Sequence, residues 1–210
     1  MTQGSHDGFL RDEDLPVWLA ARPWLDVRRN DEHTLISYRL GQALLRIYRD
    51  VDAAVVLPTI LMHDVGWKRF PPEQLAQAVG PNPRYPELQR AHEIEGVKIA
   101  TEALDRLAIP RPLRDRILAI IDGHDTRKTA TSQEDAVMKD ADKLWRFTAH
   151  GITTIGGWFD MSAKETVAML ESFVLPSMLT DAGRVMAEAL IATGEAGAWM
   201  DDLLQIEARS

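Results

Sequence analysis

The chain has 210 residues, of which 45% are hydrophobic and 27% are charged, so we expect one globular domain with a core that needs no crosslinks. It contains no cysteine, which excludes disulfides and thiolate metal ligands. The net charge of −8 argues against binding to a nucleic acid polymer or an anionic membrane, and no apolar run approaches the ~20 residues that a membrane span needs.

The N-terminus is expected to carry little structure. Residues 1–11 are mostly polar and are predicted to be flexible. They lack the apolar segment of a signal peptide, which favours a cytoplasmic protein. The patterns from residue 12 onward predict a single helical domain over residues 12–210, and a short helix within residues 12–26 should break at Pro23.

Two helical patterns follow, and each carries a histidine. Residues 30–48 have an approximate apolar stripe with His33 in the first turn. Residues 50–63 are strongly apolar and end at His63, with Asp64 directly after. A helix of this composition is expected to be central and buried, so the histidine and the aspartate should both lie inside the protein.

The middle of the chain alternates between loops and helices. Residues 67–86 are rich in proline and predict a loop region that could cover a pocket. The next helical pattern, residues 86–107, carries His92. The pattern over residues 113–122 ends two residues before His124.

The last third of the chain is also helical. Ser132 should cap a helix that carries Asp140 and Asp142. Three glycines within residues 151–157 predict a turn, and two C-terminal helices are expected within residues 160–207. No strand pattern stands out, so the fold class predicted is an all-α bundle of seven to nine helices.

The adjacent pair His63 and Asp64 carries the first chemical signal. Burying an imidazole and a carboxylate is costly unless both are paired, and a divalent cation is the usual partner. Five more residues that can bind a metal lie on predicted helices or near their ends: His33, His92, His124, Asp140 and Asp142. In the absence of thiols, imidazole and carboxylate ligands suit Mn, Fe, Ni, Co, Zn or Mg. The alternative is structural, with helix-capping histidines and satisfied polar contacts.

In this order, the residues resemble the HD-domain metal-dependent phosphohydrolase superfamily over residues 28–150. The stretch 61–66 is similar to its namesake His-Asp motif, and the stretch 140–144 is similar to its last-aspartate helix, where the family pattern selects Asp142. The resemblance implies an HD-domain-like helical bundle with one divalent ion among four residues: His33, His63, Asp64 and Asp142. His92 and His124 resemble the extra histidines of members with two ions, so one or two ions per chain both stay open.

Asp140 is expected outside the ligand set. It lies two residues before Asp142, about 200° around the helix, so both carboxylates cannot easily face one ion. We expect Asp140 beside the ligands or exposed.

The resemblance implies a hydrolase that cleaves a small phosphate ester, for which a nucleotide is one candidate, by metal-activated water. Asp64 is the catalytic candidate among the ligands. Lys68 follows the His-Asp pair, and Arg146 lies one turn after Asp142 on the same helix face, so both are candidates to clamp the phosphate. The expected partner is a small phosphorylated substrate, and a homodimer stays open.

Two other functions are compatible with these residues. A minority of HD proteins use a dinuclear iron site as an oxygenase, and a metal-stabilised regulatory domain would need no turnover. The chain departs from some relatives, because Trp67 occupies a position where dinuclear members carry lysine and the Gly-Tyr-Pro signature of the cyclic-dinucleotide branch is absent. Cyclic-dinucleotide hydrolysis is therefore disfavoured.

Overall fold

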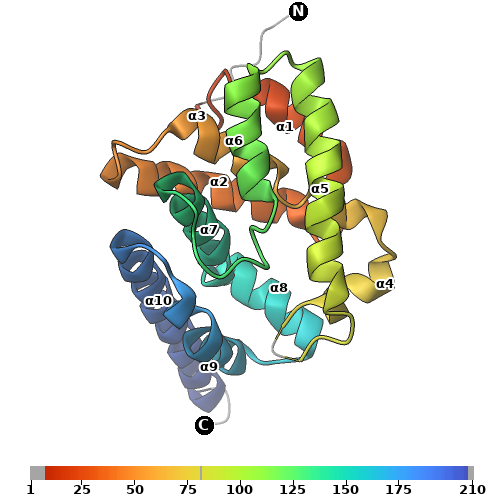
Figure 1. Cartoon of the computed structure of the whole chain (residues 1–210). Helices are drawn as coiled ribbons and strands as arrows, with labels where there is room; N and C mark the ends of the chain where they lie inside the picture. The colour runs from red at the N-terminus through yellow and green to blue at the C-terminus, as the bar shows by residue number, and fades with distance from the viewer. Residues whose placement is uncertain (1–7, 81, 208–210) are drawn as a thin grey trace, which may run out of the picture.

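The computed structural model describes residues 8–80 and 82–207, with side chains through residue 197. Within these ranges it contains helices and no strand (Figure 1). The α-helices are α1 (Leu15–Ala21), α2 (Asn30–Ile47), α3 (Ala53–Met62), α4 (Pro72–Leu75), α5 (Glu87–Arg106), α6 (Arg111–Ile121), α7 (Gln133–Arg146), α8 (Ala149–Phe159), α9 (Ala163–Phe173) and α10 (Asp181–Glu207). The short 3-10 segments are η1 (Arg22–Trp24), η2 (Val65–Arg69), η3 (Ala76–Ala78) and η4 (Leu175–Ser177).

The all-α prediction is confirmed, and the number of α-helices in the described ranges is slightly above the seven to nine expected. The flexible segment predicted for residues 1–11 falls largely on residues 1–7, which lie outside the described residues. Residues 8–11 contact the domain, because the Arg11 backbone amide donates to the Tyr38 hydroxyl at 3.1 Å. None of the helices in the described ranges has both the length and the apolar character that crossing a membrane requires.

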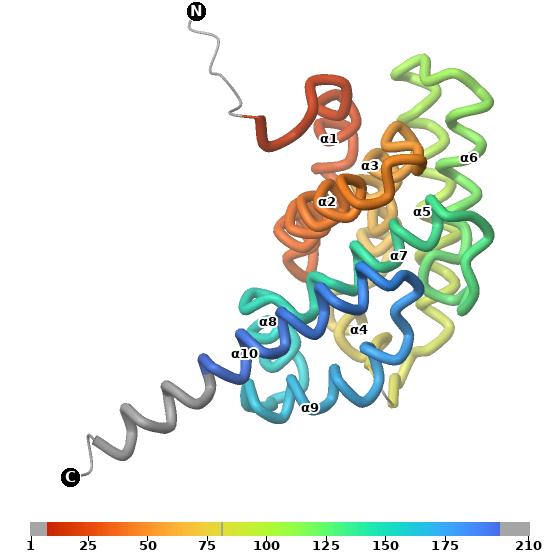
Figure 2. The backbone as a smooth tube through the Cα atoms, turned by 90° about the vertical axis from the view of Figure 1, so that its left-hand side faces the viewer, coloured from red at the N-terminus to blue at the C-terminus, as the bar shows by residue number. Residues whose placement is uncertain are grey.

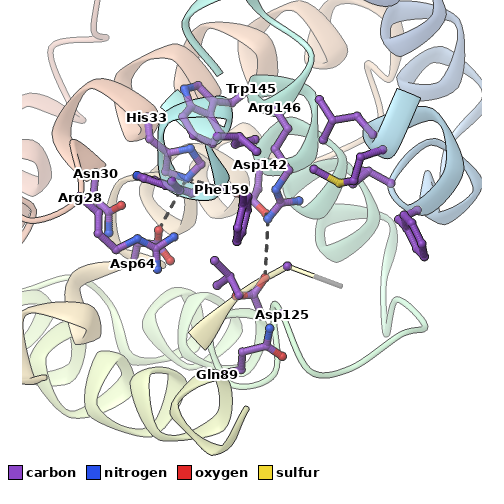
Figure 3. A pocket seen from close by; sticks show the side chains of 18 of the residues that line it. Arg28, Asn30, His33, Asp64, Gln89, Asp125, Asp142, Trp145, Arg146 and Phe159 are labelled. Carbon is purple, nitrogen blue, oxygen red and sulfur yellow. Dashed lines mark hydrogen bonds and ion pairs between the residues drawn. The ribbon is translucent and has the colours of Figure 1, made fainter. Parts of the chain in front are cut away.

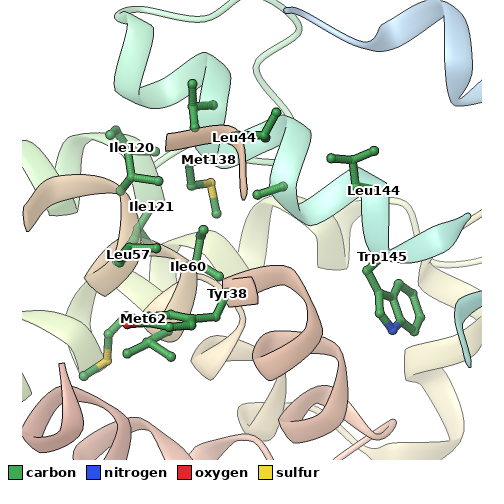
Figure 4. Close-up of a cluster of buried hydrophobic side chains, with 14 of the residues drawn as sticks. Tyr38, Leu44, Leu57, Ile60, Met62, Ile120, Ile121, Met138, Leu144 and Trp145 are labelled. Atoms are coloured by element: carbon green, nitrogen blue, oxygen red, sulfur yellow. The ribbon is translucent and has the colours of Figure 1, made fainter. Parts of the chain in front are cut away.

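The centre of the molecule is α3, which packs against α2, α6 and α7. Nearly all its side chains are apolar, and every residue from Val55 to Met62 is buried. The Asp52 carboxylate caps its start by accepting a hydrogen bond from the Ala54 amide at 3.0 Å. Leu57 and Ile60 pack with side chains of the neighbouring helices in a continuous core (Figure 4). Each fully buried side chain of this size stabilises the fold by about 1.5–3 kcal/mol, so the end of α3 is held firmly in place.

The turn predicted at the glycines of residues 151–157 is wrong, because this stretch forms α8. Thr148 caps the helix by accepting from the Gly151 amide at 3.1 Å. A Cβ at Gly151 would lie 2.1 Å from the Trp145 carbonyl oxygen, and one at Gly156 would lie 2.8 Å from the Met161 carbonyl oxygen. Glycine at these two positions therefore permits close backbone approach at both ends of a helix.

The C-terminal helices pack on one side of the domain, where α10 lies beside α7 and α9 (Figure 2). Asp140 joins α7 to this layer. Its carboxylate accepts from the Leu179 amide at 2.9 Å, the Thr180 amide at 2.8 Å and the Thr180 hydroxyl at 2.7 Å. Asp140 is thus buried rather than exposed, and it holds the segment that leads into α10.

Candidate metal centre

The end of α3 delivers the His-Asp pair to the middle of the domain. His63 follows the last residue of α3, and Asp64 precedes η2. The segment η2 lies directly against α5, because a Cβ at Gly66 would lie 1.9 Å from the His92 carbonyl oxygen. This contact brings His92 beside the pair.

Three further helices complete the cluster. His33 comes from the first turn of α2, His124 follows α6, and Asp142 lies on α7. All six residues that the family resemblance implies as ligands are buried, with at most 7% of any one exposed. Residues separated by up to 109 positions in the chain (from His33 to Asp142) therefore share one interior site.

The Asp64 carboxylate lies at the centre of the cluster. Its Oδ1 lies 3.5 Å from His63 Nε2, 3.7 Å from His92 Nε2 and 3.5 Å from His124 Nε2. Its Oδ2 lies 3.7 Å from His33 Nε2. Every histidine of the cluster thus presents the same ring nitrogen to one carboxylate.

Two groups of ligand atoms share this carboxylate. His33, His63 and Asp64 offer one set of atoms that all lie within 4.8 Å of one another, and Asp64, His92 and His124 offer a second. Asp142 extends the first group, with Oδ1 at 3.2 Å from His33 Nε2 and 3.6 Å from His63 Nε2. Each group is compact enough for one ion.

The imidazoles are oriented for cations. Nδ1 of His63 lies 2.7 Å from the Ile60 carbonyl, and Nδ1 of His124 lies 3.0 Å from the Ile121 carbonyl. His92 Nδ1 lies 3.3 Å from the Leu88 carbonyl. Nδ1 donating to a carbonyl leaves the Nε2 lone pair pointing into the cluster, as in protein metal sites.

Nitrogens that approach one another this closely need a proton or a metal ion between them. His92 Nε2 and His124 Nε2 are 3.2 Å apart, and the Nε2 atoms of His33 and His63 are 3.1 Å apart. Nitrogens that share an ion at ~2.0–2.1 Å have a similar separation. The residues present therefore fit a divalent metal in each group.

The electrostatics of the cluster favour anionic carboxylates. Burial acts to raise the pKa of Asp64, but the surrounding imidazoles, His63 foremost, hold that pKa well below its usual range. Burial also opposes ionisation of Asp142, yet Arg146 and the His33 hydrogen bond hold its pKa well below normal. Both carboxylates are thus in the ionised form that a metal requires.

The pKa values of the two histidines in the second group, His92 and His124, shift in opposite directions. Burial and the neighbouring His124 lower the pKa of His92 to about 4. Burial acts to lower the pKa of His124 as well, but its hydrogen bond with Asp64 outweighs burial and raises this pKa to about 9. A cation entering this group must displace the proton from His124.

Two tryptophans hold ligands in place rather than standing free in the pocket. Trp67 donates its indole N–H to Asp64 Oδ1 at 3.1 Å, and its ring stacks on His92 with centroids 3.9 Å apart. The Trp145 ring packs edge-on to His33 at 4.6 Å. Trp67 therefore orients the shared carboxylate and one imidazole at once.

Glu93 supports the cluster, although the sequence pattern did not single it out. It is fully buried and accepts hydrogen bonds from the Asp125 and Thr126 amides, each at 2.8 Å. It thereby fixes the loop that carries His124. A signal was present in the sequence, because Glu93 lies three and seven residues before Gly96 and Ala100 on the inward face of α5.

Beside the cluster lies a pocket of about 370 Å³. Asp64, Asp142 and His33 form part of its polar end (Figure 3). Arg146 also lines it, as its position one turn after Asp142 predicts, with Nη2 at 3.3 Å from Asp142 Oδ2 and 4.0 Å from Asp125 Oδ1. The opening therefore joins the ligand cluster to a guanidinium.

Lys68 does not line this pocket, contrary to its selection as a phosphate clamp. Its Nζ is paired with Asp26 Oδ1 at 2.5 Å on the surface. The tight geometry of η2 turns position 68 away while Trp67 points inward. Arg28, which precedes His33 in the sequence, lines the pocket instead.

Comparison with known proteins identifies the family to which the chain belongs. The chain matches the HD domain family over residues 30–146, more than half of its length. The chain therefore belongs to the HD domain family, a class of all-α proteins with a His/Asp cluster that can hold divalent metal. Neither a curated protein nor a solved structure matches it.

Proposed function

We propose that this protein is a phosphohydrolase that uses divalent metal to cleave a small phosphate ester. The observation that carries the proposal is the shared carboxylate of Asp64 between two groups of inward-facing imidazoles, next to a pocket with two arginines. Two divalent ions would exceed the charge of Asp64 and Asp142 by about two units. Such a site favours an anionic ligand over a neutral one.

A bound divalent ion supplies Lewis acidity and a water that ionises near neutral pH. The residues of the chain provide the remainder. Arg146 and Arg28 are positioned to neutralise phosphoryl oxygens, and Arg146 is itself held by Asp142 and Asp125. Trp67 fixes the orientation of Asp64, so the carboxylate need not reorganise during the reaction.

The same six ligands also suit an HD-type dinuclear iron oxygenase, which is the second candidate. The specific observation in its favour is the imidazole-rich composition of both groups, since non-haem iron is bound by imidazole and carboxylate. Bound iron together with oxygen consumption would favour the oxygenase. A regulatory domain without turnover is a third reading, and retained metal with neither activity would favour it.

The test is elemental analysis of the purified protein combined with a phosphate-release assay over a set of phosphate esters, with and without added Mn, Co, Ni or Fe. His63→Ala should lose metal and phosphate release together. The matched control is His150→Gln, because His150 is not in either ligand group and glutamine keeps an acceptor for the Trp145 indole N–H. Wild-type metal content in His63→Ala would refute the proposed site, and oxygen uptake without phosphate release would replace the hydrolase with the oxygenase.

A further inference from the structure

The pocket beside the metal cluster has two chemically different ends. The end described above is polar and charged. The other part of its lining is formed by apolar side chains of α8 and α9, namely Ile155, Trp158, Phe159, Met169, Leu170 and Phe173. We name this set the apolar wall. A pocket of about 370 Å³ lies in the size range of small-molecule sites, so both ends can contact one ligand.

The apolar wall lies outside the part of the chain that matches the family. The match ends at residue 146, whereas the first residue of the wall is Ile155. Phe173 is 63% exposed although it is large and hydrophobic. An aromatic side chain at the rim of a pocket gains little from packing within the protein, and it is available to cover an apolar ligand.

Arg28 lies between the two ends. Its guanidinium carbon is 4.8 Å from the Trp67 ring centroid and 4.6 Å from the Trp158 ring centroid. Its backbone has a φ of 53°, in the left-handed region, which costs a non-glycine residue about 1 kcal/mol or more. The strained turn directs the side chain inward from the start of α2.

Two donors near this position lack partners. Within the described part of the chain, neither Arg28 Nε nor Asn30 Nδ2 makes a hydrogen bond, and both atoms are buried. An unsatisfied buried donor costs about 1–3 kcal/mol. Both residues line the pocket, so its lining contains donors that no protein group satisfies. The anion-binding end of the pocket is thus next to the place where the apolar wall begins.

We infer that the substrate is a phosphate monoester whose alcohol part is a hydrocarbon, aromatic or branched, that lies against the apolar wall. The inference rests on the proposed function and specifies its substrate class. In the reaction, a water oxygen bonds to phosphorus and the phosphorus–oxygen ester bond breaks. The alcohol leaves with one proton from that water, and inorganic phosphate remains. A nucleotide fits less well, because the wall would leave the polar edges of a base and a ribose without partners.

The test is calorimetric titration of the metal-containing protein with two phosphonates that share a headgroup and cannot be hydrolysed as esters. We expect 1-naphthylmethylphosphonate to bind at least about tenfold tighter than methylphosphonate, because the ring leaves water for the apolar wall. Phe173→Ala should lower this preference by about threefold or more. The matched control is Ile47→Ala, since Ile47 is 59% exposed on α2 and does not line the pocket.

Equal affinity for the two phosphonates, tighter binding of adenosine monophosphate than of the naphthyl compound, or no binding of either phosphonate would overturn the inference. Met169→Gln provides a second variant in case Phe173→Ala fails to fold, and it should lower the same preference. The outcome is separable from the proposed function. Preferential naphthyl binding without phosphate release from naphthyl phosphate would support the apolar ligand site and contradict the phosphohydrolase activity. Phosphate release from small polar esters alone would support the phosphohydrolase activity and contradict the apolar ligand site.

Discussion

The two ends of the pocket come from regions of the chain that meet different physical demands. Residues 30–146 bury four imidazoles and several carboxylates, and each of these groups has a defined partner or faces a ligand position. Helices α8 and α9 contribute mainly apolar surface to the same pocket. Buried polar groups tolerate little change without large cost, whereas an apolar surface tolerates substitutions of similar volume. Under the proposed function, the catalytic chemistry and the preference for a ligand would therefore depend on separate regions of the chain.

The largest expected effect lies in the ligand region and concerns the carboxylate shared by both groups. Asp64→Asn should remove metal from both groups and lower phosphate release by at least about a thousandfold, because both ions lose a ligand. His124→Ala should leave the first group able to bind. Metal per chain measured by elemental analysis distinguishes the two variants. Equal metal loss in both variants would contradict the division into two groups.

Substitutions at two glycines of α8 test how closely α8 and α9 pack against the ligand region. Gly151→Ala should destabilise the protein by about 1–3 kcal/mol, because the new Cβ would lie 2.1 Å from the Trp145 carbonyl oxygen. The control is Gly157→Ala in the same helix, where no described atom lies within 4 Å of an added Cβ. This control should stabilise by about 0.5–1 kcal/mol. Urea denaturation measures both, and similar values for the two variants would be inconsistent with the close contact.

Arg146 and Lys68, the two basic residues selected from the sequence, should differ in their effect on kcat/KM. Arg146→Ala should lower kcat/KM by about tenfold to a hundredfold, because a hydrogen bond from a charged group to the substrate is lost. Lys68→Ala should leave kcat/KM nearly unchanged, since its surface pair with Asp26 is worth at most about 1 kcal/mol. Steady-state kinetics on one phosphate ester measures both variants. A larger loss in the lysine variant would reverse the assignment.

The smallest expected effect concerns a residue that acts through the loop of His124. Glu93→Gln should lower stability by about 1–2 kcal/mol and weaken metal binding about tenfold, because buried amide donors lose part of their charged acceptor. The control is Glu95→Gln on the same helix, because Glu95 pairs only with the surface side chains of Lys98 and Arg69. Its free energy of unfolding should change by no more than about 0.5 kcal/mol. Thermal denaturation and metal titration provide the readouts. Unchanged metal affinity in Glu93→Gln would limit that residue to a structural role.

The ligand region was the more predictable of the two. Apolar periodicity located α2, α3 and α5 to within a few residues, because the apolar residues of their packing faces recur at helical spacing. The family resemblance selected Asp142 over Asp140, and the structure shows that Asp140 instead holds the start of α10. Local sequence patterns could not predict that these distant helices converge on one site, because periodicity does not specify which helices pack together.

The errors have local physical causes. The glycines of α8 resemble a turn in sequence, because a pattern cannot distinguish backbone freedom from close backbone approach. Lys68 was selected for its proximity in the chain, yet one residue in a 3-10 segment decides whether a side chain points inward or outward. Arg28 enters the pocket through a left-handed backbone conformation, which residue spacing does not reveal.

The position of Arg28 between Trp67 and Trp158 has a consequence for how the protein can diverge. One ring belongs to the segment that orients Asp64, and the other belongs to the apolar wall. Under the proposed function, a substitution that reshapes α8 to accept a different alcohol would also move the guanidinium of Arg28. Changes in selectivity at Trp158 should therefore be accompanied by changes in turnover, while changes at the outer rim near Phe173 can alter selectivity alone.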